Sequence, residues 1–127
     1  MAASLNHTIV ASKDAKAGAA WLAEMLGLPA PKTLLPFECV ETANGVTLDF
    51  ITTDRPIAAQ HYAFLISEDD FDAIYGRIVD RGMDHWAEPN LDHPGKINHN
   101  DGGRGVYFLS PAGHFLEVLT RPYGSGG

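Results

Sequence analysis

The sequence predicts an α+β protein of two tandem βαβββ modules related by a pseudo-two-fold axis. Three observations support this prediction. A strand with a histidine, a capped helix and a glycine stop follow one another twice along the chain. Each of these sets is followed by a strand hairpin, and the two halves can be aligned residue on residue. An internal repeat constrains the fold more strongly than any single element does.

Alternating polarity begins the first module. Residues 5–12, LNHTIVAS, alternate apolar and polar positions as a half-buried strand does. Asp14 can cap an alanine-rich helix over 15–26, and Gly27 ends it. Residues 37–52, FECVETANGVTLDFIT, predict two strands joined by an Asn-Gly turn.

The same order of elements returns in the second module. Residues 61–67, HYAFLIS, predict a strand, and Ser67 with Asp70 three residues later resembles a capping box. The apolar helical stripe that follows ends at Gly82. Residues 105–120, GVYFLSPAGHFLEVLT, predict a closing hairpin.

The alignment of the two halves places like residues on like. His7 falls on His61, 54 residues later, and Gly45 falls on Gly113, 68 residues later, because the second half has a longer loop before its hairpin. In that register three further pairs match: Asp49 with Glu117, Cys39 with Tyr107, and Thr52 with Thr120.

Length and repeat together predict one domain over residues 1–127. Module one covers about 4–53 and module two about 60–121, with a flexible tail at 122–127. A chain of 127 residues is long enough to close a hydrophobic core.

Composition excludes several classes of partner. Apolar residues make up 45% and charged residues 20%, which is typical of a soluble globular protein. The net charge of −7 argues against nucleic acid and anionic membranes, and no apolar run is long enough to span a bilayer. The single cysteine and the lack of a secretory signal predict a cytoplasmic protein without internal disulfides.

The repeat also predicts a metal site. Because side chains alternate along a strand, His7, His61, Asp49 and Glu117 each stand among apolar neighbours near the middle of a strand. Imidazole and carboxylate are ligands of Fe, Mn, Ni, Co and Zn, so we expect one divalent transition metal. The alternative is that each group is satisfied within the core or faces solvent, and Asp49 could lie on an exposed strand face.

Three further side chains are candidates for substrate binding. Tyr107, ten residues before Glu117 on the neighbouring strand, could donate a hydrogen bond to a substrate or be a structural pocket residue. Arg104 could hold an anionic group or be a surface arginine. Cys39 could contact substrate, as a small buried hydrophobe or as a reactive thiolate.

Three stretches resemble the vicinal oxygen chelate superfamily, which includes glyoxalase I, bleomycin-resistance proteins, fosfomycin-resistance thiol transferases and extradiol dioxygenases. The stretch LNHTIVASKDAKAGAAWLAEMLGLP is similar to the opening strand, helix and stop of that family. QHYAFLIS is similar to the first strand of its second module, and GRGVYFLSPAGHFLEVLT to its closing hairpin, with Ser110 in place of the usual aspartate. The resemblance covers nearly the whole chain and implies a curved mixed sheet that forms a cup.

The resemblance also implies roles for individual residues. His7, His61 and Glu117 match the family's metal ligands, and Asp49 matches the position of a fourth, Glu, ligand in glyoxalase I. Tyr107 matches an active-site tyrosine of the thiol transferases and extradiol enzymes. The family often forms homodimers, whose sites are sometimes built from both chains.

Departures from the family pattern narrow the expected reaction. Asp49 in place of Glu weakens an assignment as glyoxalase I. Ile9 replaces a threonine of the fosfomycin enzymes, which disfavours fosfomycin as the substrate. Val46 is the residue nearest the position where extradiol enzymes carry an acid–base histidine, and valine cannot serve in that role.

The expected function is a metal-dependent enzyme of glyoxalase or dioxygenase type that binds a small substrate through vicinal oxygens. The metal would act as a Lewis acid, with a displaced carboxylate or bound water as proton carrier, and Glu117 and Tyr107 as catalytic residues. Lyase or isomerase chemistry comes first and an extradiol-type ring-cleaving dioxygenase second. A metal-free protein that binds a drug or metabolite is the third alternative.

Overall fold

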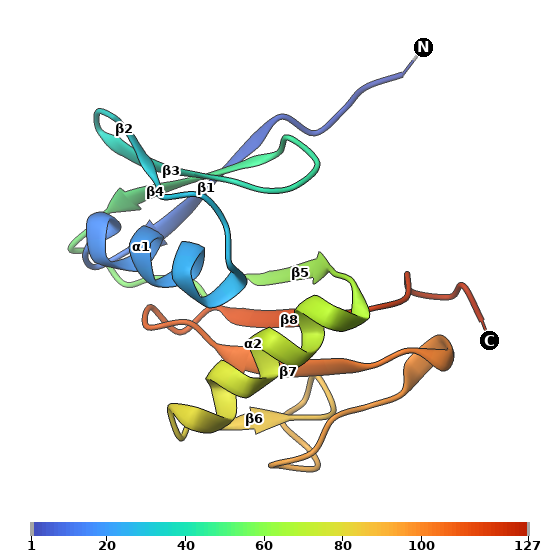
Figure 1. The fold of residues 1–127 in the computed structure, drawn as a ribbon. Helices are drawn as coiled ribbons and strands as arrows, with labels where there is room; N and C mark the ends of the chain where they lie inside the picture. The colour runs from blue at the N-terminus through green and yellow to red at the C-terminus, as the bar shows by residue number, and fades with distance from the viewer. Residues whose placement is uncertain (1, 127) are drawn as a thin grey trace. The chain divides into compact units, whose positions relative to one another are not determined.

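The computed structural model describes residues 2–126. They divide into two compact units, whose boundary lies between Ala58 and Ala59. Each unit has the order βαβββ, which confirms the predicted repeat (Figure 1). Unit 1 contains β1 (His7–Ser12), α1 (Ala15–Leu26), β2 (Lys32–Leu34), β3 (Phe37–Glu41) and β4 (Thr47–Thr52). Unit 2 contains β5 (His61–Leu65), α2 (Glu68–Asp80), β6 (His85–Trp86), a short 3₁₀ helix η1 (Asn100–Gly102), β7 (Gly105–Leu109) and β8 (Phe115–Leu119).

Each unit forms one mixed four-stranded sheet, and the strand order is equivalent in the two. The orders are β1-β4-β3-β2 and β5-β8-β7-β6. The first strand of each unit runs parallel to its last strand, and the remaining pairs are antiparallel. This is an α+β architecture, as expected.

The strand register confirms the alignment made on the sequence. In unit 1 Cys39 lies opposite Asp49, and in unit 2 Tyr107 lies opposite Glu117. The parallel pairs agree in the same way: His7 opposite Thr47, and His61 opposite Phe115.

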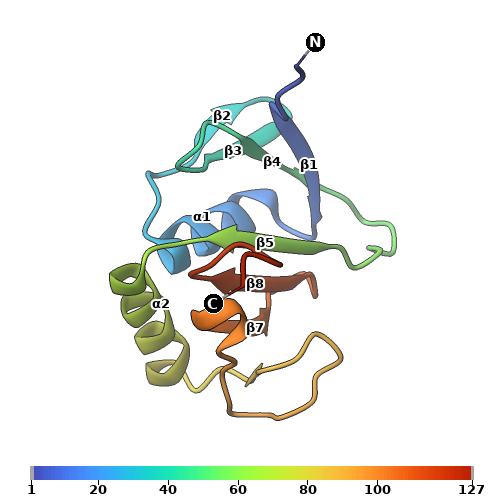
Figure 2. The same cartoon turned by 90° about the vertical axis from the view of Figure 1, so that its right-hand side faces the viewer.

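In unit 1 the buried face of the sheet carries the apolar half of the alternation, whereas in unit 2 the middle of β7 and β8 is buried on both faces. In unit 1 α1 packs against β1, β3 and β4, as Figure 2 shows. The buried side chains of that unit include Val10, Val40, Leu48, Phe50, Leu22 and Met25. Those of unit 2 include Phe71, Ile74 and Ile78 from α2 with Val106, Phe108, Leu116 and Val118 from the sheet.

Both predicted helix caps are present. The carboxylate of Asp14 accepts a hydrogen bond from Ala17 N at 3.0 Å, and the Ser67 hydroxyl accepts one from Asp70 N at 3.1 Å. Each cap satisfies a backbone N–H at the start of its helix. Neither helix described in residues 2–126 has the length and apolar character that crossing a membrane requires.

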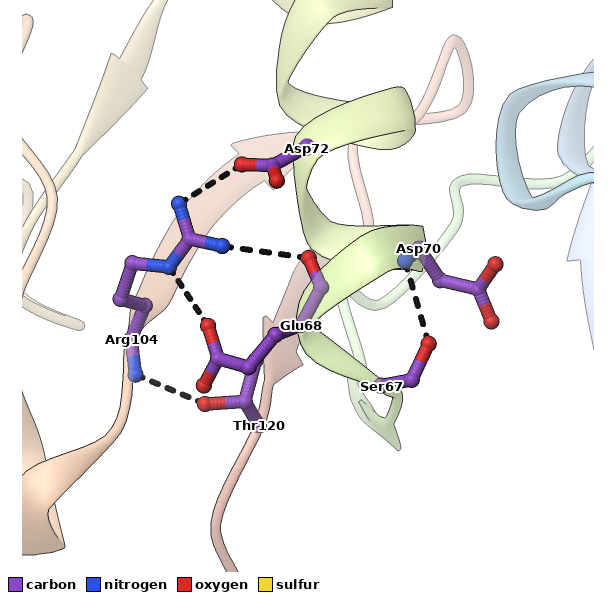
Figure 3. Close-up of polar contacts among 6 residues, drawn as sticks. All are labelled: Ser67, Glu68, Asp70, Asp72, Arg104 and Thr120. Atoms are coloured by element: carbon purple, nitrogen blue, oxygen red, sulfur yellow. Dashed lines mark hydrogen bonds and ion pairs between the residues drawn. The ribbon is translucent and has the colours of Figure 1, made fainter.

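Arg104 joins the start of β7 to the first turn of α2 (Figure 3). Its guanidinium donates to Glu68 Oε1 at 2.7 Å, to the Glu68 carbonyl oxygen at 3.1 Å and to Asp72 Oδ1 at 2.8 Å. The same group lies 4.4 Å from the centre of the Phe71 ring. The Thr120 hydroxyl oxygen accepts a hydrogen bond from Arg104 N at 2.8 Å, so the end of β8 joins the cluster.

This cluster predicts an acid-sensitive step in stability. Hydrogen bonds from Thr120 and then Arg104 lower the pKa of Glu68 below its ordinary 4.5. A carboxyl whose folded pKa is below its unfolded pKa stabilises the fold above the unfolded value, and this stabilisation is lost as the pH falls through the folded pKa. We expect Glu68→Gln to lower the melting temperature at neutral pH and to lose less on acidification below pH 4.5 than the wild type.

Melting temperatures followed by circular dichroism between pH 7 and pH 3 measure this difference. Asp80→Asn, which removes a carboxylate at the other end of α2, is the matched control. Parallel acid profiles for the wild type and Glu68→Gln would contradict the assigned role of Glu68.

Candidate metal and substrate site

Unit 2 brings two of the predicted ligands into contact. Glu117 lies on β8 and is 4% exposed, although it carries a charge. His61 lies on β5, the parallel neighbour of β8, and its Nε2 is 3.1 Å from Glu117 Oε1. Burying a carboxylate is costly unless a hydrogen-bonding or positive group faces it, and His61 is the side chain that faces Glu117.

The imidazole of His61 faces a hydrogen-bond acceptor at both nitrogens. Its Nδ1 is 3.1 Å from the carbonyl oxygen of Phe115, and its Nε2 faces the Glu117 carboxylate. A neutral imidazole has one N–H and can satisfy only one of these acceptors. If Nδ1 donates to the carbonyl, the Nε2 lone pair points at a carboxylate oxygen. A proton shared between Nε2 and the carboxylate, or a cation bound between the two side chains, resolves this conflict.

A transition metal is one such cation. Imidazole nitrogen and carboxylate oxygen are the ligand atoms that such metals take. His61 Nε2 and Glu117 Oε1 stand 3.1 Å apart, which is also the length of a direct hydrogen bond, so the two side chains would be the ones to hold the metal. A histidine whose other nitrogen donates to a backbone carbonyl is also the usual form of a metal-bound imidazole. Within residues 2–126, no three His, Cys, Asp or Glu side chains cluster closely enough to hold a metal by themselves.

Tyr107 stands beside this pair. It is 2% exposed, lies opposite Glu117 in the register, and its ring stacks on that of His61 with centroids 5.9 Å apart. Burial, a hydrogen bond with Tyr123 and the nearby charge of Glu117 raise the pKa of the Tyr107 phenol far above its usual value. The phenol therefore keeps its proton at physiological pH and serves as a hydrogen-bond donor.

In unit 1 the equivalent histidine and carboxylate, His7 and Asp49, do not form the contact seen in unit 2. His7 is exposed and its Nδ1 is 2.7 Å from the side-chain oxygen of Asn6. Asp49 is half-buried, and its Oδ1 is a buried atom without a hydrogen-bond partner in the described chain. Such an atom is costly in a fold and fits a site for a cation. That His7 and Asp49 join His61 and Glu117 on one metal stays a prediction.

Cys39 and Arg104 have protein partners in this structure. Cys39 is half-buried and lies opposite Asp49 in the strand register, and the neighbouring carboxylate contributes to the raised pKa of its thiol. Arg104 binds the carboxylates of α2 and stacks on Phe71, on the helix-covered side of the sheet. Substrate contacts by Cys39 and Arg104 stay predictions.

One residue of the site was missed in the sequence. Tyr123 lies in the tail and contributes to the raised pKa of the Tyr107 phenol. Its only sequence signal is that it is a single aromatic residue in an otherwise polar, glycine-rich stretch.

Comparisons with known proteins agree with the fold and widen the choice of chemistry. No family model matches the chain. The solved structure of the oxidase ChaP-H2 is 58% identical, with a TM-score of 0.97 and an alignment that covers 100% of both chains. The glutathione transferase FosA of Serratia marcescens is 29% identical over 126 residues, which span 93% of this chain and 81% of that protein. A lactoylglutathione lyase of Agrobacterium tumefaciens is 16% identical with a TM-score of 0.69 over 94% of both chains, and shows the fold alone.

The contact between Cys39 and Asp49 predicts how the thiol reacts. Burial and then the hydrogen bond to Asp49 raise the pKa of Cys39. Because the thiolate is the nucleophile, Asp49→Asn should lower that pKa and speed alkylation by iodoacetamide at pH 8. Mass spectrometry of the single cysteine gives the rate directly. Asp54→Asn makes the same charge change at an exposed position of unit 1, and an equal acceleration there would show that net charge, rather than this contact, sets the rate.

Proposed function

The chain belongs to the vicinal oxygen chelate superfamily, and we propose that it is a metal-dependent oxidase that uses dioxygen to oxidise a small molecule bound through vicinal oxygens. The observation that carries the proposal is the His61 imidazole held between two acceptors, the carbonyl of Phe115 and the carboxylate of Glu117. The 58% identity to the oxidase ChaP-H2 over the full length of both chains supports oxidation over the other reactions of the superfamily.

The proposed metal ligands are His61 and Glu117 from unit 2, with His7 from unit 1 as the third. Asp49 is a candidate fourth ligand because its orphaned Oδ1 is of a suitable type. When bound, Fe, Mn, Ni, Co or Zn supplies an electrophilic centre for the substrate oxygens, and the redox-active ones also react with dioxygen. The resemblance implies a homodimer, which we include in the proposal.

The side chains of unit 2 have separate roles in this proposal. The Phe115 carbonyl fixes the ring of His61 so that Nε2 faces the site. Burial of Glu117 keeps water from screening its charge, which strengthens its attraction for a cation. The Tyr107 hydroxyl keeps its proton and can donate it in a hydrogen bond to a substrate oxygen that carries negative charge.

Glyoxalase-type lyase chemistry remains the alternative. Two of the similar proteins, FosA and lactoylglutathione lyase, carry names that refer to glutathione. Their sequences are 29% and 16% identical to this chain, which is less than the 58% of the oxidase. Asp49 stands where glyoxalase I carries Glu, and the shorter side chain disfavours the four-protein-ligand octahedron.

The proposed site predicts metal-dependent stability. Metal-free protein should bind close to one equivalent of Fe(II), Mn(II), Ni(II), Co(II) or Zn(II). A metal at a free concentration 100 times its Kd should raise the free energy of unfolding by about 2.7 kcal/mol. His61→Ala, Glu117→Gln and His7→Ala should each lose this increase, measured by elemental analysis and thermal unfolding. The matched control is His93→Ala, which removes an exposed histidine from the loop before β7.

An unchanged thermal transition on addition of all five metals would refute the metal-dependent reading. It would favour the metal-free binding protein instead. If only the His7→Ala variant still binds one metal per chain, His7 is not a ligand, and His61 and Glu117 remain the proposed ligands.

The proposed reaction predicts oxygen consumption. Anaerobically metal-loaded protein, mixed with catechols and dihydroxynaphthalenes as probes, should consume oxygen at an electrode, with stoichiometric loss of the probe. Glu117→Gln should lower the rate at least about 100-fold, because removing a charged ligand abolishes the site. Turnover of the methylglyoxal–glutathione adduct without oxygen uptake would establish the lyase alternative.

A further inference from the structure

His114 is a buried histidine at the end of the turn that connects β7 to β8, and the proposed function does not use it. The residue is 2% exposed and its side chain is among the largest that are fully buried. Its backbone N–H donates to the Ser110 hydroxyl at 3.1 Å, and its carbonyl oxygen accepts from Ser110 N at 2.9 Å. Burying an imidazole is costly unless its ring has hydrogen-bond partners, so the contacts of the ring carry the question of what His114 does.

The ring of His114 holds the residue that precedes His61. Gln60 N donates to His114 Nδ1 at 3.0 Å, although the two residues are 54 positions apart in the chain. A backbone amide is only a donor, so Nδ1 is the unprotonated nitrogen and the proton of the neutral ring is on Nε2. The ring of Tyr62, the residue after His61, packs edge to face against that of His114 with centroids 5.6 Å apart. His114 therefore contacts both chain neighbours of His61.

The backbone of Gln60 is held a second time, by the first residue of β8. Phe115 N donates to the carbonyl oxygen of Gln60 at 2.8 Å, and the carbonyl oxygen of Phe115 lies 3.1 Å from His61 Nδ1. The N–H and the C=O of Gln60 are thus both bound by two consecutive residues, His114 and Phe115. A shift of one residue would turn every side chain of β5 to the other face, so this register brings His61 Nε2 within 3.1 Å of Glu117 Oε1.

Unit 1 contains the same strand pair without such a histidine. Thr47 N donates to the carbonyl oxygen of Asn6 at 3.0 Å, which is the equivalent of the bond to the Gln60 carbonyl. The residue before Thr47 is Val46, whose side chain can accept no hydrogen bond. In this unit the side-chain oxygen of Asn6 lies 2.7 Å from His7 Nδ1. The two units therefore differ both in the residue before the last strand and in the partner of the histidine Nδ1.

We propose that His114 is a positioning residue, which binds the backbone before His61 and so sets the imidazole of His61 against the carboxylate of Glu117. The inference rests on the proposed function in that this pair is taken as part of the metal centre. His114 acts through Gln60 and is not itself a ligand. Its Nδ1 lone pair accepts from the amide and its Nε2 carries the proton, so neither nitrogen offers a lone pair to a metal.

Such a contact should act on metal affinity. An imidazole that is already held in its binding orientation loses less conformational freedom when the metal binds. Residues that orient the ligands of a metal site typically change its affinity about 10- to 100-fold. Because His114 holds the strand that carries His61, we expect an effect at the lower end of that range.

The hydrogen bond can be tested first in the unaltered protein, without metal or turnover. Labelling with ¹⁵N-histidine marks the rings of all six histidines, which single-residue variants assign. At mildly alkaline pH the ring nitrogen shifts of His114 should show Nδ1 unprotonated and the proton on Nε2. A proton on His114 Nδ1 would overturn the inference, whatever reaction the protein performs.

Two substitutions of nearly the same shape separate the hydrogen bond from the packing. Asparagine keeps an acceptor oxygen near the place of Nδ1 and leucine has none, while both lack the imidazole ring. In His114→Leu the Gln60 amide should exchange with solvent at least about fivefold faster, and the ring resonances of His61 should shift. In His114→Asn both measurements should stay close to the wild type.

The positioning role is tested by the Kd for a metal, with Co(II) and Zn(II) as probes. This Kd should rise about tenfold in His114→Leu and less than about threefold in His114→Asn. A structural role alone would affect both variants equally, because both remove the same ring, so equal Kd values would overturn the positioning role. Where His114→Leu fails to fold, the tautomer of the unaltered protein and the Kd of His114→Asn still decide. A tenfold rise in that Kd would count against the inference.

His85→Leu is the matched control. His85 is a half-buried histidine of the same unit, with Nδ1 3.1 Å from the Met83 carbonyl oxygen and Nε2 3.2 Å from the Tyr75 hydroxyl. It lies on β6, at the opposite edge of the sheet from β5. His85→Leu should lower the melting temperature and leave the Kd for the metal unchanged. A rise in Kd as large as that of His114→Leu would show that overall stability sets the affinity, and would overturn the positioning role.

The measurements also separate this inference from the proposed function. The tautomer of His114, the exchange of the Gln60 amide and the resonances of His61 are all observed in metal-free protein. If they behave as expected while none of the metals binds, the proposed function fails and the positioning of His61 by His114 stands.

Discussion

The site depends on one electrostatic constraint, the buried carboxylate of Glu117 opposite an imidazole that already faces another acceptor. The backbone carbonyl of Phe115 holds the Nδ1 side of His61, so the Nε2 side must meet the carboxylate. Both acceptors come from β8, and the parallel pairing of β5 with β8 puts His61 next to them. The sheet thus creates a demand for positive charge at a defined point, and a metal or a proton satisfies it.

The two units carry the same design with side chains of different length. In each, a histidine lies on the first strand, a carboxylate on the last strand and a third polar side chain opposite that carboxylate. Glu117 reaches His61, whereas the shorter Asp49 has one buried oxygen without a partner and His7 turns to Asn6. The pair is formed in unit 2 and not in unit 1, where the carboxylate side chain is one methylene group shorter. Duplication of the βαβββ unit therefore explains why the candidate ligands occupy equivalent positions in the two sheets.

The sequence was sufficient for the fold because every element had a local cause. Caps at Asp14 and Ser67, period-two strands and an Asn-Gly turn all act within a few residues of themselves. The alternation rule also places Arg104 and Tyr107, three positions apart, on opposite faces of the sheet, and Arg104 is indeed engaged by α2. The contact that holds the tail could not be predicted, because Gly124 and Gly126 donate to Asp101, more than twenty residues earlier in an aperiodic loop.

The side chains around the candidate metal ligands, rather than the ligands themselves, must distinguish one reaction of this superfamily from another. Transferases, lyases and oxidases are all found among proteins similar to this chain, so histidine and carboxylate ligands cannot by themselves select one. What unit 2 adds is a buried phenol, Tyr107, that lies opposite the carboxylate of Glu117 and keeps its proton. Such a donor stabilises negative charge on a substrate oxygen without removing the charge. The Tyr107 phenol is therefore the part of these surroundings that can act on a substrate oxygen beside the candidate ligands.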